Sequence, residues 1–283
     1  MLVVFSMFLP IDTAYDTRGV LICSGCLFCV ESTTAMKYQR RFYRDFTDSD
    51  LVSFEVKIKE SDLCIFAHSN LRNAAFEELC RQRTALEQYI ASHPDFYLSF
   101  TPVATDKSAP EIVRIMSEAS FLGDVGPMAA VAGAIAEMVG RKLLNFTPEV
   151  IVENGGDLFL HVTRPRTVML YAGTSPFSTK VGLLIDKPGT QIGIGTSSGT
   201  FGHSFSFGKA DSVTVVCKSA AIADALATFF GNLVKDENDF SIISDKLKDM
   251  PFVDGVVAIV KDKMFVQGDV KLVRFDRNCG EGK

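Results

Sequence analysis

The sequence predicts an α+β fold, in which mixed or antiparallel sheets pack against helices within one domain. Candidate strands come in runs instead of alternating regularly with helices, and this favours α+β over a doubly wound fold. Apolar residues make up 47% of the chain and charged residues 22%, which is enough for a sizeable core. One helical segment, near residues 128–144, is apolar on almost every side, as is typical of a buried helix.

The first half of the chain begins with strands and continues with helices. Alternating polar and apolar residues, or short apolar runs, predict three antiparallel strands at one edge of a sheet. Apolar residues at helical spacing predict a helix that ends before Pro94, and a second helix is expected to open at Pro110. These elements are the strands at 40–45, 52–59 and 63–67 and the helices at 71–91 and 110–118, the first with Ala75, Leu79, Leu86 and Ile90 as its apolar residues.

The second half is dominated by strands. Residues 193–208 are rich in Gly, Ser and Thr, which is typical of a loop. An alanine-rich helix at 219–231 follows a strand of β-branched residues. The strands expected here are 149–153, 157–162, 167–172, 181–186, 212–217 and a closing meander of 256–260, 264–266 and 270–273, with a polar helix near 240–249.

We expect the folded domain to span residues 36–275, followed by a short tail at 276–283. The character of the sequence changes at Met36, where a polar and aromatic alternation begins. Residues 1–35 are expected to be a disordered extension or a wrongly assigned start, because no Lys or Arg precedes their first apolar stretch and Pro10 interrupts it. An export anchor is the alternative, since the sequence before Cys23 loosely resembles a lipoprotein cleavage box.

Charge and cysteine content restrict the partners. The net charge is −5 and there is no basic stripe, so we expect no nucleic-acid partner. No apolar run reaches the roughly 20 residues that span a bilayer. Seven scattered cysteines argue against a disulfide framework and for a reducing, cytoplasmic location. A homo-oligomer is the default expectation for the assembly.

Asp224 and Thr228 form the first candidate site. They stand four residues apart in the alanine-rich helix, so their oxygens lie on one face, one turn apart. Carboxylate and hydroxyl oxygens suit Mg²⁺ or Ca²⁺, and do not suit zinc. A helix with one polar corner in solvent is the alternative interpretation.

Asn154, Gly155, Gly156 and Asp157 form the second candidate site. They follow a strand-like apolar run, so they predict either a tight hairpin turn or a place where a ligand approaches the backbone. In the second case Asp157 could hydrogen-bond a ribose or a base.

The third candidate is the segment Thr196, Ser197, Ser198, Gly199 and Thr200, which leads to His203. Small residues that present N–H groups and hydroxyls can cradle a phosphate, although the glycine–lysine spacing of a P-loop is missing. A flexible loop is the alternative, and His203 is either a catalytic residue or an ordinary packed or exposed histidine.

One physical argument joins the three candidates. Asp157 and Asp224 near a polyanion would repel it, but a bound divalent cation reverses this effect. A cation together with backbone donors is also a common way of stabilising charge in phosphoryl chemistry.

These motifs occur in the same order in ApbE-like proteins, and the chain resembles that superfamily over roughly residues 36–275. The segment from Thr196 to Asp211 is similar to that of its shorter, uncharacterised UPF branch. The resemblance implies an ApbE-like, T-fold-related domain that binds FAD and Mg²⁺ and transfers FMN from FAD to a Thr or Ser hydroxyl of an acceptor protein, with release of AMP. It also implies that Asp224 and Thr228 bind the metal and that residues 154–157 line the flavin nucleotide site.

The chain departs from the family pattern at two places. In the segment that supplies a backbone carbonyl to the metal, Pro127 can still offer its carbonyl, but Ala130 and Ile135 replace a lysine and an acid. The stretch after His203 differs as well. Two hypotheses therefore stand: an ApbE-type, Mg²⁺-dependent enzyme that acts on FAD, or a non-catalytic protein that binds a flavin or a phosphorylated metabolite.

Overall fold

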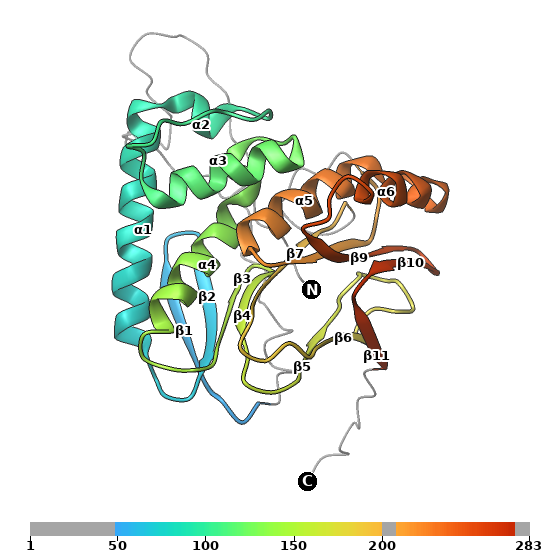
Figure 1. Ribbon diagram of the computed structural model, residues 1–283, viewed down its shortest axis with the longest axis horizontal. Helices are drawn as coiled ribbons and strands as arrows, with labels where there is room; N and C mark the ends of the chain where they lie inside the picture. The colour runs from blue at the N-terminus through green and yellow to red at the C-terminus, as the bar shows by residue number, and fades with distance from the viewer. Residues whose placement is uncertain (1–48, 200–207, 275–283) are drawn as a thin grey trace, which may run out of the picture.

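The computed structural model describes residues 49–199 and 208–274, which form three layers (Figure 1). The central layer is an eight-stranded antiparallel sheet with the strand order β1-β2-β3-β4-β7-β8-β9-β10. Helices cover one face of this sheet, and a three-stranded sheet, β11-β6-β5, packs on the other. Antiparallel sheets with packed helices confirm the predicted α+β class.

Within the described residues, the elements of the first half include every strand and helix expected there, together with two short helices that were not expected. They are β1 (Val52–Ile58), β2 (Ser61–Ala67), α1 (Arg72–Ser92), α2 (Pro94–Leu98), α3 (Glu111–Gly123), the 3₁₀ helix η2 (Pro127–Ala130) and α4 (Val131–Leu143). Pro94 ends α1 and opens α2. The four apolar residues expected on the inner face of α1 are buried, and α4 is buried along most of its length.

The second half contains more strands than helices. Its elements are β3 (Val150–Asn154), β4 (Asp157–His161), β5 (Arg166–Met169), β6 (Val181–Ile185), β7 (Gln191–Ser197), β8 (Ser212–Cys217), α5 (Ala220–Leu233), the 3₁₀ helix η3 (Glu237–Asp239), α6 (Phe240–Leu247), β9 (Val253–Val260), β10 (Lys263–Gly268) and β11 (Lys271–Arg274). The expected closing meander is wrong at its end, because β11 leaves β10 and pairs with β6 in the small sheet.

Strand β7 corrects the expectation of a loop from residue 193. The glycines that suggested a loop are strand residues whose missing side chains let α5 lie directly on the sheet. A β carbon at Gly193 would overlap the backbone of Ser219 and Ala220, and one at Gly195 would overlap that of Ala223. Close approach between a helix and a strand explains these glycines better than flexibility does.

The core has two sides because strand residues alternate between the faces of the large sheet. Phe159 packs with the helices, whereas its neighbours Leu158 and Leu160 pack against the small sheet. Among the residues described, no single helix is long and apolar enough to cross a bilayer. The bent pair of α3 with the segment Pro127–Leu143 meets that test by length and composition alone.

Several sequence predictions concern residues outside the described ranges. The extension at 1–35, the strand at 40–45 and the tail at 276–283 belong to this group, as do Thr200 and His203.

Candidate functional site

Gly155 and Gly156 form the two-residue turn between β3 and β4. Asn154 and Asp157 pair across this turn, and the glycines have φ values of 67° and 118°, which side chains rarely adopt. The Gly156 N–H donates to the Glu153 carboxylate at 3.0 Å. A tight hairpin is therefore the structural role of these glycines, and a ligand-binding role of the same residues stays a prediction.

Asn154 and Asp157 are buried and face the helical layer, since Leu158 faces the small sheet. The Asn154 side-chain amide donates to the Ala132 carbonyl of α4 at 3.0 Å. Asp157 accepts a hydrogen bond from the Thr196 N–H of β7 at 3.2 Å. The hairpin is thus fixed both to the start of α4 and to β7.

Asp224 lies on α5 and is 1% exposed. Its Oδ2 accepts a hydrogen bond from the Gly133 N–H at 2.9 Å, but its Oδ1 has no hydrogen-bond partner. Burial raises the pKa of this carboxyl from 3.8 to about 8, against the opposing effect of backbone hydrogen bonds from Gly133 and Ala132. A buried oxygen without a partner is costly, so this position requires an explanation.

A second carboxylate connects the same two helices in the opposite direction. Glu137 of α4 accepts hydrogen bonds from the Ser219 hydroxyl at 2.7 Å and the Ala220 N–H at 2.9 Å, at the start of α5. Each helix thus supplies an acid to the first turn of the other, where N–H groups and the helix dipole favour negative charge. We call this pair of contacts the α4–α5 clasp. It needs glycine at position 133, because a β carbon there would overlap Ala220.

Ser197 faces α5 from the sheet. Gly193 and Gly195, on the same face of β7, lie against the first two turns of α5, and Ser197 is the next residue on that face. Its hydroxyl is buried and has no hydrogen-bond partner. Thr196 points to the opposite face, where its hydroxyl lies 3.0 Å from that of Thr214. The structure thus separates Ser197 from Thr196, two members of the predicted phosphate cradle.

The remaining described residues of the prediction lie on α5, on η2 and directly after β7. Thr228 is half-buried, one turn after Asp224 on α5, and Pro127 is buried in η2, which packs against α5. Ser198 is buried at the end of β7, and the Gly199 N–H donates to the Ala210 carbonyl at 2.9 Å. We call the set Asn154, Asp157, Ser197, Asp224 and Thr228 the Asp224 cluster.

The donor chemistry of the Asp224 cluster suits a hard cation. The predicted ligands are two members of the cluster, the carboxylate of Asp224 and the hydroxyl of Thr228, together with the carbonyl of Pro127 from η2. All three are oxygens that Mg²⁺ and Ca²⁺ accept. The second oxygen of Asp224, which has no partner, fits this role. Within the described residues no group of three or more His, Cys, Asp or Glu side chains could hold a metal, so zinc and iron ligand sets have no support there.

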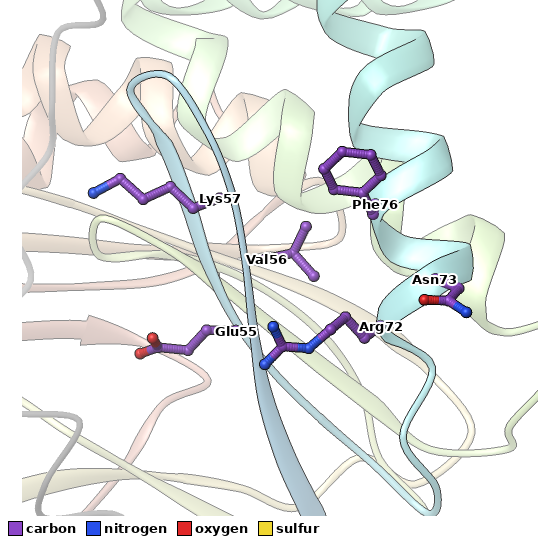
Figure 2. Close-up of a pocket in the computed structure, with 6 residues that line it drawn as sticks. All are labelled: Glu55, Val56, Lys57, Arg72, Asn73 and Phe76. Atoms are coloured by element: carbon purple, nitrogen blue, oxygen red, sulfur yellow. The ribbon is translucent and has the colours of Figure 1, made fainter.

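An open hollow lies elsewhere on the molecule. It has a volume of about 480 Å³ and lies beside β1 and α1, lined by Glu55, Val56, Lys57, Arg72, Asn73 and Phe76 (Figure 2). A smaller hollow of about 20 Å³ lies by the small sheet, between β6 and Val270. Neither includes a predicted site residue. We place the candidate site at the Asp224 cluster because buried polar groups without partners indicate chemistry more directly than open volume does.

Comparison with known proteins identifies the family. A sequence profile described as AbpE bacteria matches residues 44–252. The chain belongs to this family. It is 41% identical to the UPF0280 protein of Methanocaldococcus jannaschii over 74% of this chain and 87% of that protein. The corresponding values for the UPF0280 protein of Methanopyrus kandleri are 38%, 77% and 88%.

A solved structure shows the same fold. The apo form of the flavinyl transferase ApbE from Pseudomonas stutzeri aligns with a TM-score of 0.51 and 14% identity, over 77% of this chain and 93% of that one. The sequence profile and the UPF0280 relatives confirm the expected membership of the ApbE-like superfamily, near its UPF branch, and the solved structure agrees in fold. The family membership does not test the individual site residues, whose roles remain proposals.

Glu137 and Gly133 were missed by the sequence analysis, although both leave a signal. Glu137 is an acid in an otherwise apolar helical segment, and the same reasoning had singled out Asp224. Gly133 stands four residues before it, where the helix propensity of alanine would be better. A glycine and an acid four residues apart in a buried helix therefore indicate a close helix crossing with a capping carboxylate.

Proposed function

We propose that this protein binds a divalent cation, Mg²⁺ or Ca²⁺, together with FAD or another nucleotide at the Asp224 cluster. We further propose that it acts as an ApbE-type transferase, moving FMN from FAD to a hydroxyl of an acceptor protein and releasing AMP. The observation that carries the proposal is Oδ1 of Asp224, a buried carboxylate oxygen without a partner on the helix face that also bears Thr228.

The chain's own residues have separate tasks in this proposal. Asp224, Thr228 and the Pro127 carbonyl hold the cation, which supplies positive charge to an otherwise acidic site. Asn154 fixes the start of α4 next to the hairpin, and the Thr196 N–H holds Asp157 in place. The hydroxyl of Ser197 is available as a donor to a phosphate oxygen. The loop residues Ser198, Gly199 and Thr200 complete the cradle, and His203 is the proposed proton acceptor.

A second candidate function is a flavin or phosphorylated-metabolite binding protein without transfer activity. One observation favours it: Ala130, at the position of the family lysine, is completely buried at the end of η2. Loss of that lysine removes a cation that could meet phosphate. We also propose a cytoplasmic location, a symmetric homo-oligomer and no nucleic-acid partner, on the charge and cysteine content of the chain.

The experiment mixes the purified full-length protein with FAD and Mg²⁺ and measures AMP by chromatography; water takes the place of the acceptor hydroxyl, so FMN is the second product. We expect AMP release that Asp224→Asn abolishes, while Glu118→Gln, on the exposed side of α3, leaves it unchanged. Tight flavin binding without AMP at any Mg²⁺ concentration would establish the second candidate. Absence of any FAD affinity would overturn the transferase and leave a protein that binds another phosphorylated metabolite.

A further inference from the structure

Two hydrogen bonds of the candidate site meet on one peptide group at the start of α4. The Asn154 side-chain amide donates to the Ala132 carbonyl at 3.0 Å, and the Gly133 N–H donates to Oδ2 of Asp224 at 2.9 Å. The Ala132 carbonyl and the Gly133 N–H belong to the same planar peptide unit. One peptide group of α4 therefore connects the β3–β4 hairpin to Asp224.

The Gly133 N–H is one of the first N–H groups of α4, which have no acceptor within the helix. The N-cap residue, Ala130, supplies no side-chain hydrogen bond, and the carboxylate of Asp224 from α5 takes its place. Asn154, Gly133 and Asp224 are all buried, so bulk water does not compete for either hydrogen bond. Both contacts are therefore stronger than the same contacts would be on the surface.

The two hydrogen bonds reinforce each other. A hydrogen bond to a carbonyl oxygen polarises the peptide group, which makes the N–H of that group a better donor. Asn154 thus strengthens the contact between Gly133 and Oδ2 of Asp224, while the other oxygen, Oδ1, is buried without a hydrogen-bond partner. Carboxylates that bind metals are commonly held by such outer hydrogen bonds, which orient them and change the affinity for the metal.

The position of Asn154 in the sheet suits it to orient another residue. It lies at the end of β3, where it pairs with Leu63 of β2 on one side and with Asp157 of β4 on the other. Its main chain is therefore fixed on both sides, and only its side-chain torsions remain to place the amide. A site built on strands of a sheet is held more precisely than one built on loops.

We propose that Asn154 is a positioning residue of the cation site. Its amide acts through the Ala132–Gly133 peptide group to hold the Asp224 carboxylate in an orientation that leaves Oδ1 for the cation. The inference rests on the proposed function, because it takes Asp224 as a cation ligand. It gives Asn154 a task that lining a nucleotide site does not require, and it links two of the candidate sites by contacts that the structure contains.

A purely structural role, in which Asn154 only attaches the hairpin to α4, is the competing explanation. Asn154→Leu separates the two, because leucine has nearly the shape of asparagine and lacks the amide. The chain also offers a matched control at the other end of the same helix. There the Asn145 side-chain amide donates to the Lys142 carbonyl at 2.9 Å, so Asn145→Leu removes the same kind of hydrogen bond from α4 without touching Asp224.

The first measurement is NMR on the cation-free, full-length protein. Loss of the amide at position 154 weakens the donor at Gly133, so Asn154→Leu should shift the Gly133 amide proton upfield. The amides of Ala134 and Ile135, which follow in α4, should stay in place, as should the Gly133 amide in Asn145→Leu. A loosened helix start would instead move all these amides of α4 together.

The second measurement is the affinity for Mn²⁺ by calorimetry. Asn154→Leu should lower the affinity by about tenfold, as expected for a residue that orients a metal ligand, and Asn145→Leu should leave it unchanged. In the Asp224→Asn background, Asn154→Leu should have no further effect, because a residue that acts through Asp224 has no carboxylate left to orient.

The outcomes separate this inference from the proposed function. If the wild-type protein binds no Mn²⁺, the cation site and the positioning role both fail. If it binds Mn²⁺ with equal affinity in wild type and Asn154→Leu, or if the Gly133 amide does not move in that variant, the positioning role alone is overturned.

The smaller substitution Asn154→Ala replaces Asn154→Leu if the latter does not fold. If neither folds, the wild-type spectrum decides. Mg²⁺ should then shift the Asn154 side-chain amide and the Gly133 amide along one titration curve, and an Asn154 signal that does not respond to Mg²⁺ would overturn the inference.

Discussion

The two ends of the helical layer differ in how their polar groups are arranged. At the α4–α5 clasp, Asp224 and Glu137 are almost fully buried, and the backbones are so close that glycine is required. Beside β1 and α1, Arg72 and Lys57 line a hollow of about 480 Å³ and are exposed to solvent. The polar groups beside the hollow stay in water and have no desolvation cost, whereas the buried carboxylates of the clasp have a large one.

This difference bears on where function is sought. An exposed charge is solvated and needs no ligand, so the polar residues of the hollow at β1 do not by themselves indicate a binding site. A buried carboxylate with one oxygen unpaired is unfavourable unless something compensates it, which favours a cation site at Asp224. The two regions predict opposite responses to mutation, pH and metal.

The largest expected effect is steric. Gly195→Ala should destabilise the protein by about 3 kcal/mol or more, because the new methyl group meets the backbone of Ala223 and α5 cannot shift without losing the clasp. Asn73→Ala, in the hollow, should change the free energy of unfolding by less than about 0.5 kcal/mol. Urea unfolding measures both. Similar losses of unfolding free energy in Gly195→Ala and Asn73→Ala would contradict the claim that the two regions differ in packing.

The clasp itself should contribute the next largest effect. Glu137→Ala removes the acceptor for Ser219 and for the first N–H of α5, so we expect a loss of about 2 kcal/mol. Ser219→Ala alone should cost about 1 kcal/mol as the loss of an N-cap. Both substitutions remove the same hydrogen bond, from the Ser219 hydroxyl to Glu137. Their effects on the free energy of unfolding should therefore be less than additive in the double variant, and strict additivity would argue against the clasp.

Asp224 should make the cation-free protein less stable as the pH rises. Its pKa of about 8 in the folded state exceeds its usual value of 3.8, so the folded state binds more protons between pH 4 and pH 8. Stability should fall across this window by at most about 1.4 kcal/mol per pH unit. Thermal melting should show that Mg²⁺ raises the Tm more at pH 8 than at pH 6. Asp224→Asn should flatten the pH slope and abolish the Mg²⁺ effect; a slope unchanged in that variant would contradict the assignment.

The smallest effect is expected in the hollow. Arg72 is exposed, so Arg72→Ala should leave both the stability and the Mg²⁺-induced rise in Tm within error of the wild-type protein. If the Mg²⁺-induced rise in Tm were largely lost in Arg72→Ala, the cation would bind in the hollow and not at Asp224.

The sequence predicted the elements with clear periodicity and missed those decided by contacts between distant segments. The inner face of α1 and the buried α4 followed from spacing and composition alone. Strand β7 could not be predicted in the same way, because Gly193 and Gly195 are unfavourable in strands unless a helix lies directly on them. The pairing of β11 with β6 in the small sheet likewise depends on contacts between segments that are distant in sequence.

The candidate site shows the same division. Asp224 and Thr228 were singled out from their helical spacing, and the Asn154–Asp157 hairpin from its glycines. Other contacts of the site depend on how α4 and α5 cross. They are the hydrogen bond from Asn154 to Ala132 and the two carboxylate contacts made by Asp224 and Glu137 between the helices. The local sequence signals that crossing only through Gly133, which permits it, and Glu137, the acid four residues later.

Titration of the full-length protein with Mn²⁺, followed by calorimetry at pH 8 with and without FAD, tests the cation site most directly. Mn²⁺ accepts the same oxygen ligands as Mg²⁺. We predict one Mn²⁺ per chain that excess Mg²⁺ displaces, with an affinity at least about tenfold lower in folded Asp224→Asn and unchanged in Glu118→Gln. Equal affinity in wild type and Asp224→Asn would contradict the account.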